Sequence, residues 1–404
     1  MRNVSQSIRE FNQDRLPEML QLKYAAMRQN AFRFYRGTCH LFYEDLAKHP
    51  PVKDDTRVWI CGDLHLENFG SYKGDNGLVY FDMNDFDESI LAPATWEITR
   101  LLCSIHIATK ELKINETGAD QLVRICLNAY ISVLRKGNAT AVETRMAKGL
   151  LKYFLLQVAC RKNKDLVGRR TVKENGKISL RTDHKIYFPL TAAKKKKVTG
   201  LIHRWNRSSH PAKQYEVMDS AFRIAGTGSI GIHRYAALVL EKKSSKYRLL
   251  DIKEAVSSSL KPYAKLKQPA WENEAQRVVA IQKRVQFVSP ALLDVVRMDG
   301  RAFVLKELQP IEDKMNFSLC NGKLGKLQKI AVAMGEISAF GQLRSSGRQG
   351  SDIADKLIVF GINSAKWEKA VLQYAGRYAS QVAADYQSFC REYDKGYFKD
   401  NGKN

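Results

Sequence analysis

The spacing of hydrophobic residues divides the chain into helical ends and a strand-rich middle. Apolar side chains recur at helical intervals over about residues 1–50, 94–112 and 118–160, and again from about 322 to the end. From Ala221 onward, short apolar runs separated by polar turns predict strands instead. These runs are FRIAG, IHRYAALVLE, YRLLDIKEA, LLDVVRM and RAFVLKEL, with a helix expected over about 270–287. Asp299-Gly300, between the last two runs, predicts a tight hairpin turn.

This pattern predicts four regions. We expect a helical region over 1–160, a basic and irregular linker or insertion over 161–214, a strand-rich unit over 215–310, and a second helical region over 311–404. An antiparallel five-stranded unit with one helix, placed between two mostly helical regions, gives an α+β fold class.

Composition and cysteine usage favour a soluble protein of a reducing compartment. Of the 404 residues, 44% are hydrophobic and 27% are charged, which is typical of globular chains. The seven cysteines are scattered and form no CxxC pair, which argues against a disulfide framework and a structural zinc site. The N-terminus has no apolar segment of signal-peptide length, and no apolar run reaches the roughly 18 residues of a membrane span. We therefore expect a cytoplasmic protein with no membrane partner.

The net charge of +24 is concentrated in the middle of the chain. The basic runs are RKNKDLVGRR at Arg161–Arg170, KKKK at Lys194–Lys197, and the stretch 203–213. Such a field attracts nucleic acid by counterion release, or steers small anionic substrates. A solvated surface without a ligand explains the same runs equally well.

The segment CGDLHLENFG…VYFDMNDFDE carries the chemistry that phosphoryl transfer needs. Asp63 follows a short strand, and Asn68 lies five residues later in the same loop. Asp82 comes near the end of the apolar strand LVYFD. A carboxylate can accept a proton from an attacking hydroxyl, while an amide oxygen and a second carboxylate are hard ligands for Mg²⁺. We predict that Asp63, Asn68 and Asp82 form a catalytic and metal-binding group.

Two other metal sites fit this segment less well. DMNDFDE resembles a calcium loop, but Phe86 is apolar at the fifth position and no glycine stands at the sixth, which argues against an EF-hand. His65 and Glu67 do not form the HExxH pattern of zinc proteases.

A glycine-rich motif precedes the second predicted strand of the middle unit. Gly226, Thr227, Gly228, Ser229 and Gly231 belong to a GxGxxG pattern followed by a strand rather than by a helix, which favours a phosphate-covering flap over a dinucleotide fold. An ordinary hairpin bulge would also explain the glycines. Lys253 ends a later strand, where it either faces a cleft or is simply solvated.

These residues resemble the active site of the protein-kinase-like fold. The order D-x4-N followed by a strand aspartate is similar to HGDxHxxN…IDxxD of aminoglycoside and choline kinases, with Cys61 standing where those families usually have histidine. The resemblance implies that Lys253 contacts nucleotide phosphates and that Glu274 pairs with it, with Gln276 or Glu272 as alternatives. It also implies that Lys306–Gln309 forms a hinge against adenine.

The order of these elements differs from that of ordinary kinases. The glycine flap follows the catalytic loop here, and GEISAFGQLRSSG (335–347) resembles the helix and turn that normally lead into that loop. The resemblance therefore implies a circular permutation. The large lobe would comprise 1–160 and 311–404, and the small nucleotide-binding lobe 215–310. An unrelated second domain is the alternative.

The chain also resembles a bacterial family named for domain of unknown function 2252. The resemblance is carried, in this order, by FYRG, CGDLHLENFG, FDMNDFDE, PATWEITRL, GTGSIG, KEA and AFGQLRSSG. It adds Arg36, Asp85, Asp87 and Arg100 as secondary site candidates. Asp85 and Asp87 would supply further metal ligands, Arg36 would contact phosphate or cap a helix, and Arg100 would pair with an acidic neighbour.

The expected function is ATP- and Mg²⁺-dependent phosphoryl transfer to a small or anionic hydroxyl-bearing acceptor. Nucleotidyl transfer on the same fold is one alternative. The other is a basic nucleic-acid-binding protein with a vestigial cleft. The acceptor and the oligomeric state remain open at the level of sequence.

Overall fold

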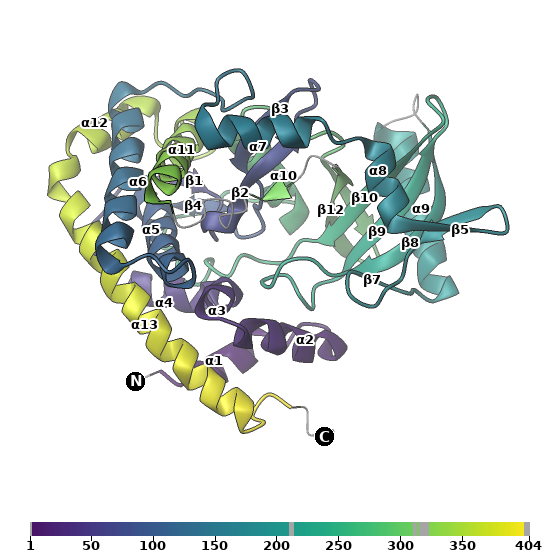
Figure 1. Ribbon diagram of the computed structural model, residues 1–404, viewed down its shortest axis with the longest axis horizontal. Coiled ribbons are helices and arrows are strands. Elements are labelled where there is room, and N and C mark those ends of the chain that lie inside the picture. The colour runs from purple at the N-terminus through teal and green to yellow at the C-terminus, as the bar shows by residue number, and fades with distance from the viewer. Residues whose placement is uncertain (1, 210–213, 310–312, 315–322, 400–404) are drawn as a thin grey trace.

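Helices and antiparallel strands together build the protein, as the α+β class predicts (Figure 1). A computed structural model describes residues 2–209, 214–309, 313–314 and 323–399. The helices are α1 (Val4–Phe11), α2 (Pro17–Arg28), α3 (Ala31–Gly37), α4 (Cys39–Lys48), α5 (Ala94–Glu111), α6 (Glu116–Lys136), α7 (Gly149–Ala159), α8 (Asn163–Arg170), α9 (Ala192–Ser209), α10 (Glu274–Val285), α11 (Leu324–Arg344), α12 (Ala354–Ile362) and α13 (Glu368–Asp394). The strands are β1 (Val58–Ile60), β2 (Phe69–Lys73), β3 (Val79–Met83), β4 (Ile90–Ala92), β5 (Thr171–Glu174), β6 (Lys177–Leu180), β7 (Tyr187–Phe188), β8 (Tyr215–Arg223), β9 (Arg234–Glu241), β10 (Lys246–Glu254), β11 (Asp294–Met298), β12 (Arg301–Leu308) and β13 (Asp313–Lys314).

The largest sheet in the described residues has six antiparallel strands in the order β11-β12-β10-β9-β8-β7. Four of them correspond to apolar runs predicted from the sequence. The predicted run FRIAG overlaps β8 only at Phe222 and Arg223, because the strand starts earlier, at Tyr215. The short strand β7 adds an edge. Asp299 and Gly300, at the β11–β12 turn, have φ angles of 52° and 74°, which confirms the predicted tight turn. Helix α10 is somewhat shorter than the predicted 270–287.

Each face of this sheet is covered by a different element. Along β9, Tyr235, Ala237 and Val239 belong to the hydrophobic cluster that includes α9. Ala236 and Leu238 alternate with them and pack in the cluster that includes residues of α8 and β6. Because successive side chains of a strand point to opposite faces, a strand with apolar residues at both sets of positions must be buried on both sides.

The region 161–214 was predicted as an irregular linker or insertion, and the structure shows that it is not irregular. It contains α8, the β5–β6 hairpin, β7 and α9, all packed around the sheet, while residues 210–213 lie outside the described part of the chain. In α9 the buried residues Val198, Leu201, Ile202 and Trp205 have helical spacing. They begin only after the lysine run, so the dense charge at the start of the helix obscured its apolar stripe.

The helical region is assembled around α5, α6, α11 and α13, with α1 beside α13 (Figure 1). Gly335 allows α11 to approach α6 closely, since a Cβ atom there would lie 2.1 Å from the carbonyl oxygen of Cys126. The helical pattern predicted over 118–160 is interrupted. Helix α6 ends at Gly137, which has a φ of 66°, and α7 starts at Gly149.

Two small sheets lie next to this helical region and carry the loops of interest. Strands β1 and β4 form one, and β13, β2 and β3 form the other. None of the helices in the described ranges has the length and apolarity required to cross a membrane. The region boundary predicted at 310–311 and Cys320 lie outside the described residues.

Candidate active site

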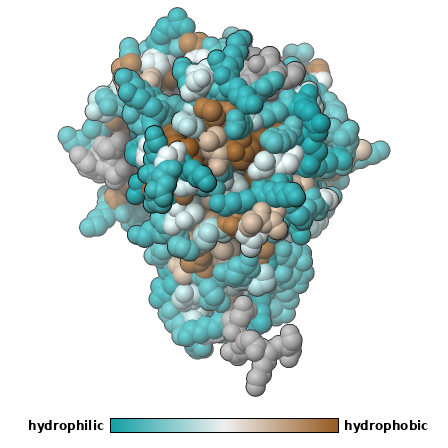
Figure 2. All heavy atoms as spheres, turned by 90° about the vertical axis from the view of Figure 1, so that its right-hand side faces the viewer, coloured by the Kyte–Doolittle hydropathy of each residue, from teal (hydrophilic) through white to brown (hydrophobic). Residues whose placement is uncertain are grey.

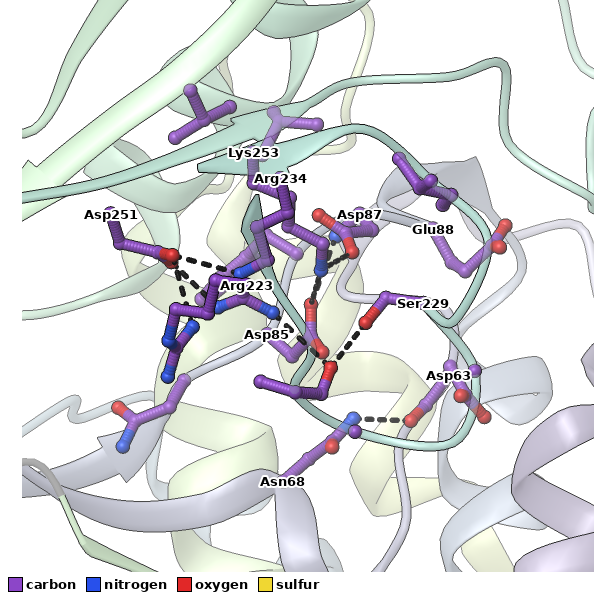
Figure 3. Close-up of a pocket in the computed structure, with 18 of the residues that line it drawn as sticks. Asp63, Asn68, Asp85, Asp87, Glu88, Arg223, Ser229, Arg234, Asp251 and Lys253 are labelled. Atoms are coloured by element: carbon purple, nitrogen blue, oxygen red, sulfur yellow. Dashed lines mark hydrogen bonds and ion pairs between the residues drawn. The ribbon is translucent and has the colours of Figure 1, made fainter. Parts of the chain in front are cut away.

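Charged side chains from three distant parts of the chain line a cavity of about 390 Å³ (Figure 3). Arg15 and Arg36 come from the N-terminal helices and their connections, and Asp63 and Asn68 from the loop after β1. The loop after β3, the β8–β9 loop, and strands β9, β10 and β12 supply much of the rest, and helices α8 and α10 also contribute to the lining. A cavity of this size is in the range of small-molecule sites.

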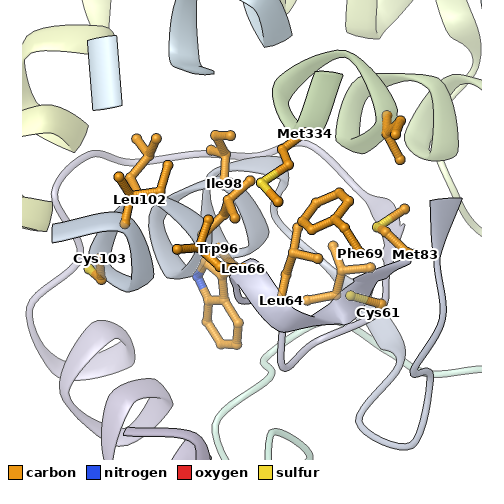
Figure 4. Packing of buried hydrophobic residues seen from close by; sticks show 14 of the residues in the cluster. Cys61, Leu64, Leu66, Phe69, Met83, Trp96, Ile98, Leu102, Cys103 and Met334 are labelled. Carbon is orange, nitrogen blue, oxygen red and sulfur yellow. The ribbon is translucent and has the colours of Figure 1, made fainter. Parts of the chain in front are cut away.

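Successive side chains of the loop after β1 point alternately into the hydrophobic core and toward the cavity. Leu64 and Leu66 are buried in the main hydrophobic cluster, next to Phe69 and Ile98 (Figure 4). The residues before, between and after them, Asp63, His65 and Glu67, line the cavity. The apolar residues thus anchor the loop while the polar ones face the site.

Gly62 brings this loop against the loop that follows β3. Its φ is 88°, and a Cβ atom there would lie only 2.3 Å from the carbonyl oxygen of Glu88. Only glycine tolerates both the dihedral angle and the contact. Glu97 on α5 supports the same turn by accepting a hydrogen bond from the Cys61 backbone nitrogen at 2.6 Å.

Asp63 is held by Arg100 from α5. Arg100 donates to Asp63 Oδ1 from Nη2 at 2.6 Å and from Nε at 3.1 Å, and its guanidinium lies 3.7 Å from the ring centroid of Tyr35. Burial raises the pKa of Asp63 above its ordinary value, and the charges of Arg100 and Arg36 oppose that rise. The sequence expectation that Arg100 pairs with an acidic residue is confirmed, and that residue is the predicted base.

Asn68 is fixed by contacts on both sides. Its Nδ2 donates to the backbone oxygen of Asp63, and its own backbone oxygen accepts from the Asn84 nitrogen at 2.9 Å. The second contact continues the β2–β3 ladder, in which Gly70 is paired with Asp82. The hairpin therefore places the loops after β1 and after β3 side by side.

Asp82 does not line the cavity with Asp63 and Asn68. Its side chain is buried, and Oδ2 accepts from Arg344 Nη2 on α11 at 2.9 Å. Burial raises the pKa of Asp82, which Arg344 opposes. In the loop after the strand, the carboxylates that line the cavity are those of Asp85, Asp87 and Glu88.

Lys253 on β10 meets this acidic loop. Its Nζ lies 3.8 Å from Asp85 Oδ1 and forms a closer ion pair with Asp87 Oδ2, although 166 positions separate Lys253 from Asp87 in the sequence. Burial tends to raise the pKa of Asp85, but Lys253, Lys306 and Arg234 together hold it below its ordinary value. Burial and the neighbouring charge of Asp85 raise the pKa of Asp87 in spite of Lys253.

Glu274 is not the ion-pair partner of Lys253, which corrects the prediction. Glu274 pairs with Arg277, three residues later on α10. The alternatives are also engaged elsewhere, since Glu272 pairs with Arg297 and Gln276 accepts from the Glu272 nitrogen. Helix α10 contacts the acidic loop through Arg277 instead, which donates to the backbone oxygen of Asp87 at 2.9 Å.

The glycine-rich loop is fastened to the N-terminal helices. Arg15 Nη1 donates to the backbone oxygens of Gly228 at 2.8 Å and Ile230 at 2.7 Å. Lys23 on α2, which is fully buried, donates to the Gly228 oxygen at 2.8 Å and to the Thr227 oxygen at 3.3 Å. Gly226 and Gly228 line the cavity with Ser229, while Gly226 and Gly231 have φ angles of 74° and 89°. The loop thus covers one side of the cavity and is braced from behind by two cations that sequence analysis did not identify.

A second network missed by sequence analysis lies on the sheet itself. Asp251, two positions before Lys253 on β10, accepts hydrogen bonds from Arg234 at 2.6 and 2.8 Å and from Arg223 at 2.9 Å (Figure 3). These arginines outweigh the effect of burial and lower the pKa of Asp251. Arg234 also donates to the Ala225 oxygen at 3.3 Å, so the network supports the glycine loop. The alternation of side chains along a strand could have indicated this network. Asp251 and Lys253 lie two positions apart on β10, so their side chains share a face of the sheet.

The remaining candidates lie at the two ends of the cavity. Arg36 lines it beside Asp63 and forms an ion pair with Glu67. At the other end, Lys306, Leu308 and Gln309 of the expected hinge line the cavity. The Gln309 side chain bonds the backbone of Lys73, linking the sheet to the β2–β3 hairpin.

The cavity offers a partial set of metal ligands. In the described ranges, no three His, Cys, Asp or Glu side chains are grouped so that they could hold a metal ion by themselves. Mg²⁺, however, is commonly held by one or two carboxylates together with substrate phosphates. Asp85 and the amide oxygen of Asn68 match that donor set.

Comparison with known proteins identifies a family but no activity. The profile of a family described as an uncharacterized protein conserved in bacteria (DUF2252) matches residues 15–392. Neither the curated proteins nor the solved structures contain a match to the chain.

Proposed function

This chain belongs to the bacterial family that shares domain of unknown function 2252, and we propose that it is an ATP- and Mg²⁺-dependent phosphotransferase with a kinase-like cleft. The observation that carries this proposal is the convergence of Asp63, Asn68, Asp85 and Lys253 on one cavity beneath the glycine-rich loop. In kinases the same parts perform phosphoryl transfer: a glycine loop over the phosphates, a lysine on the third strand, a catalytic aspartate, and asparagine and aspartate metal ligands.

Asp63 is proposed as the group that accepts the proton of the attacking hydroxyl. Oδ1 is occupied by Arg100, and we assign Oδ2, which lies 3.9 Å from His65 Nε2, to the acceptor. Arg100 holds the carboxylate in position, as an orienting residue rather than as a group that touches the substrate. The raised pKa of Asp63 makes it a better proton acceptor than an exposed aspartate.

We assign the metal ligand after β3 to Asp85 in place of Asp82. Asp85 faces the cavity and is held in its charged form by neighbouring cations, whereas Asp82 is committed to Arg344. Asn68 uses Nδ2 to bond Asp63, so Oδ1 is the amide atom available as a ligand. When bound here, Mg²⁺ would neutralise charge on the transferred phosphoryl group.

Lys253 is proposed to contact nucleotide phosphates. In the structure it neutralises Asp87 and lies near Asp85. If nucleotide and Mg²⁺ were bound, Lys253 would pair with phosphate oxygens and Asp85 with the metal. Each charged group would then keep a partner of opposite charge. The Lys253–Asp87 pair itself fastens strand β10 to the acidic loop at this side of the cleft.

The contacts of the turn after α11 support the proposed circular permutation. The Asp352 nitrogen donates to the Arg57 oxygen at 2.7 Å, and Trp59 Nε1 donates to the Arg348 oxygen at 2.9 Å. This late turn therefore lies beside β1, the strand that leads into the catalytic loop. In an unpermuted order the turn would continue directly into that strand. The packing of α1 beside α13 is consistent with such an exchange of chain ends.

The test is nucleotide binding and turnover in wild type, Asp85→Asn and the matched control Asp75→Asn, an exposed aspartate outside the cavity. We expect Mg²⁺-dependent ATP binding and transfer of γ-phosphate label in wild type and the control, and loss of both in Asp85→Asn. A protein that binds no nucleotide in Mg²⁺, or an Asp85→Asn variant that behaves as wild type, overturns the proposal. Transfer of an α-phosphate label would assign nucleotidyl transfer instead.

A further inference from the structure

Helix α8 separates the cavity from a second, strongly basic hollow. Leu166 and Arg170 line the cavity. The other side of the helix presents Lys162, Lys164 and Arg169 to a hollow that Arg161 and Arg181 complete. Since Arg169 and Arg170 are neighbours, a line of cations runs from the hollow to the cavity.

The most conspicuous basic run of the sequence lies elsewhere and is paired within the protein. Lys194 and Lys197 on α9 lie 3.4 and 2.9 Å from the carboxylate of Asp299, and Lys195 lies 2.6 Å from Asp219. Three of the four consecutive lysines are therefore paired, although Lys194 and Lys197 share one carboxylate. This run serves to attach α9 to the sheet and is a poor candidate for binding a partner.

Among the described residues, three of the cations around α8 lack such compensation. Within the described parts of the chain, Lys162, Lys164 and Arg169 form no ion pair, and Asp165 is the acidic residue lining the hollow. The β5–β6 hairpin continues the surface with exposed Lys173 and Lys177. It projects from the body of the protein in Figure 1, and Figure 2 shows that hydrophilic residues cover most of this end. We refer to α8 and the β5–β6 hairpin together as the basic surface.

The shape and chemistry of the basic surface select the kind of partner. Its cations are spread over a helix and a hairpin, which suits a chain of repeated phosphates better than one small anion. The hairpin turn, Glu174-Asn175-Gly176, has no apolar side chain to insert into lipid, which disfavours a bilayer. The cavity of about 390 Å³ can admit the end of a single strand but not a duplex.

We propose that the basic surface binds single-stranded nucleic acid and directs the end of the bound strand into the cavity. The acceptor would then be a terminal hydroxyl of the nucleic acid, an assignment that rests on the proposed phosphotransferase function. In that step a bond forms between the hydroxyl oxygen and the γ-phosphorus of ATP, and the bond from that phosphorus to the ADP oxygen breaks. Asp63 takes the hydroxyl proton, and ADP leaves.

Binding is tested with a fluorescently labelled single-stranded oligonucleotide of about 12 nucleotides, a typical length for such sites. The variant is the triple substitution Lys162→Gln, Lys164→Gln, Arg169→Gln, at exposed positions outside the cavity. The matched control is Lys110→Gln, Lys366→Gln, Lys369→Gln, which removes the same charge from exposed positions of the helical region. Anisotropy is recorded over a range of salt concentrations, with ATP binding measured separately in the absence of oligonucleotide.

We expect the variant to bind the oligonucleotide at least about tenfold more weakly than the control, with the slope of log K against log salt reduced by about 2, since each lost phosphate contact contributes about 0.7. Equal binding by the variant and the control overturns the proposal. So does binding of inorganic polyphosphate or anionic vesicles without binding of the oligonucleotide.

The acceptor role has its own readout, which is transfer of γ-phosphate label to the oligonucleotide. Label on the oligonucleotide in wild type, and less of it in the triple variant, supports the role. Tight oligonucleotide binding together with ATP binding, but no label on the strand, overturns it. Absence of ATP binding alongside salt-sensitive oligonucleotide binding would instead remove the phosphotransferase proposal and leave the basic surface as a nucleic-acid site.

Discussion

Arg344 on α11 donates from Nη2 to Asp82 Oδ2 at 2.9 Å, and this buried pair joins strand β3 to the helical region. Arg344 also donates to the backbone oxygens of Val285 and Thr140. Asp82 is therefore part of a structural junction. Three residues later, Asp85 faces the cavity and Lys253.

Because Asp82 lies at a structural junction and Asp85 faces the cavity, we expect Asp82→Asn to reduce stability and Asp85→Asn to reduce nucleotide binding. Asp82→Asn removes the charge that compensates buried Arg344, so we expect a loss of about 3–5 kcal/mol in the free energy of unfolding. Asp85→Asn should leave thermal stability nearly unchanged but abolish Mg²⁺-dependent nucleotide binding. Thermal unfolding and nucleotide titration of both variants check this. The assignment is wrong if Asp82→Asn is stable and defective only in metal-dependent binding.

The Asp63–Arg100 pair predicts the pH dependence of activity. A general base must be deprotonated, so kcat/KM should fall as pH decreases through the pKa of Asp63, which burial places above the ordinary aspartate value of about 3.9. Arg100→Lys keeps the charge but loses the two-point contact, which should raise this pKa further and move the acid limb to higher pH. Asp63→Asn should lower kcat by a factor of about 10²–10⁴. An acid limb that is unchanged in folded Arg100→Lys would show that Arg100 does not act through Asp63.

Glu97 makes the stability of the catalytic loop dependent on pH. Burial raises the pKa of Glu97 to about 7, from 4.5 for the ordinary side chain. Between these two values the folded protein binds more protons than the unfolded chain, so the free energy of unfolding decreases as pH rises and levels off above about 7. The difference corresponds to about 3 kcal/mol.

Glu97→Gln should remove this dependence while keeping an acceptor for the Cys61 nitrogen. Denaturant unfolding of both proteins between pH 5 and 8 checks the prediction. The variant should gain stability relative to wild type as pH increases. Parallel curves for the two proteins would mean that Glu97 ionises normally in the fold.

The glycine-rich loop should depend on Lys23, although Lys23 does not line the cavity. Lys23→Met leaves the backbone oxygens of Thr227 and Gly228 with one donor fewer, at a cost of about 1–3 kcal/mol for a buried acceptor that loses its partner. Removing a buried amine offsets part of that cost, since burial and the nearby charge of Arg15 lower the pKa of Lys23 well below its ordinary value. We therefore expect a folded protein whose loop is less well held.

The measurement is titration with ATP in Mg²⁺, with exposed Lys48→Met as the control. Affinity should fall several-fold in Lys23→Met and remain unchanged in the control. If Lys23→Met binds ATP as tightly as wild type, the contact between α2 and the loop has no role in nucleotide binding.

Local sequence determined the elements of the middle unit and the candidate loop. Four strands and the Asp299-Gly300 turn were predictable because alternation and turn chemistry act over a few residues. The nearness of Asp63 and Asn68 was predictable for the same reason, since both stand in one short loop. Helix α9 was not, because its lysine run preceded and obscured the apolar stripe.

Tertiary structure alone decided which charged residues meet. Asp82 and Asp85 are three positions apart, and nothing in the local pattern distinguishes the one that pairs with Arg344 from the one that faces Lys253. The bracing of the glycine loop by Lys23 and the pairing of Arg100 with Asp63 also join segments far apart in the chain. Hydrophobic periodicity fixes how a segment folds and which face it buries, whereas the partner of a charge depends on which distant segment packs against that face.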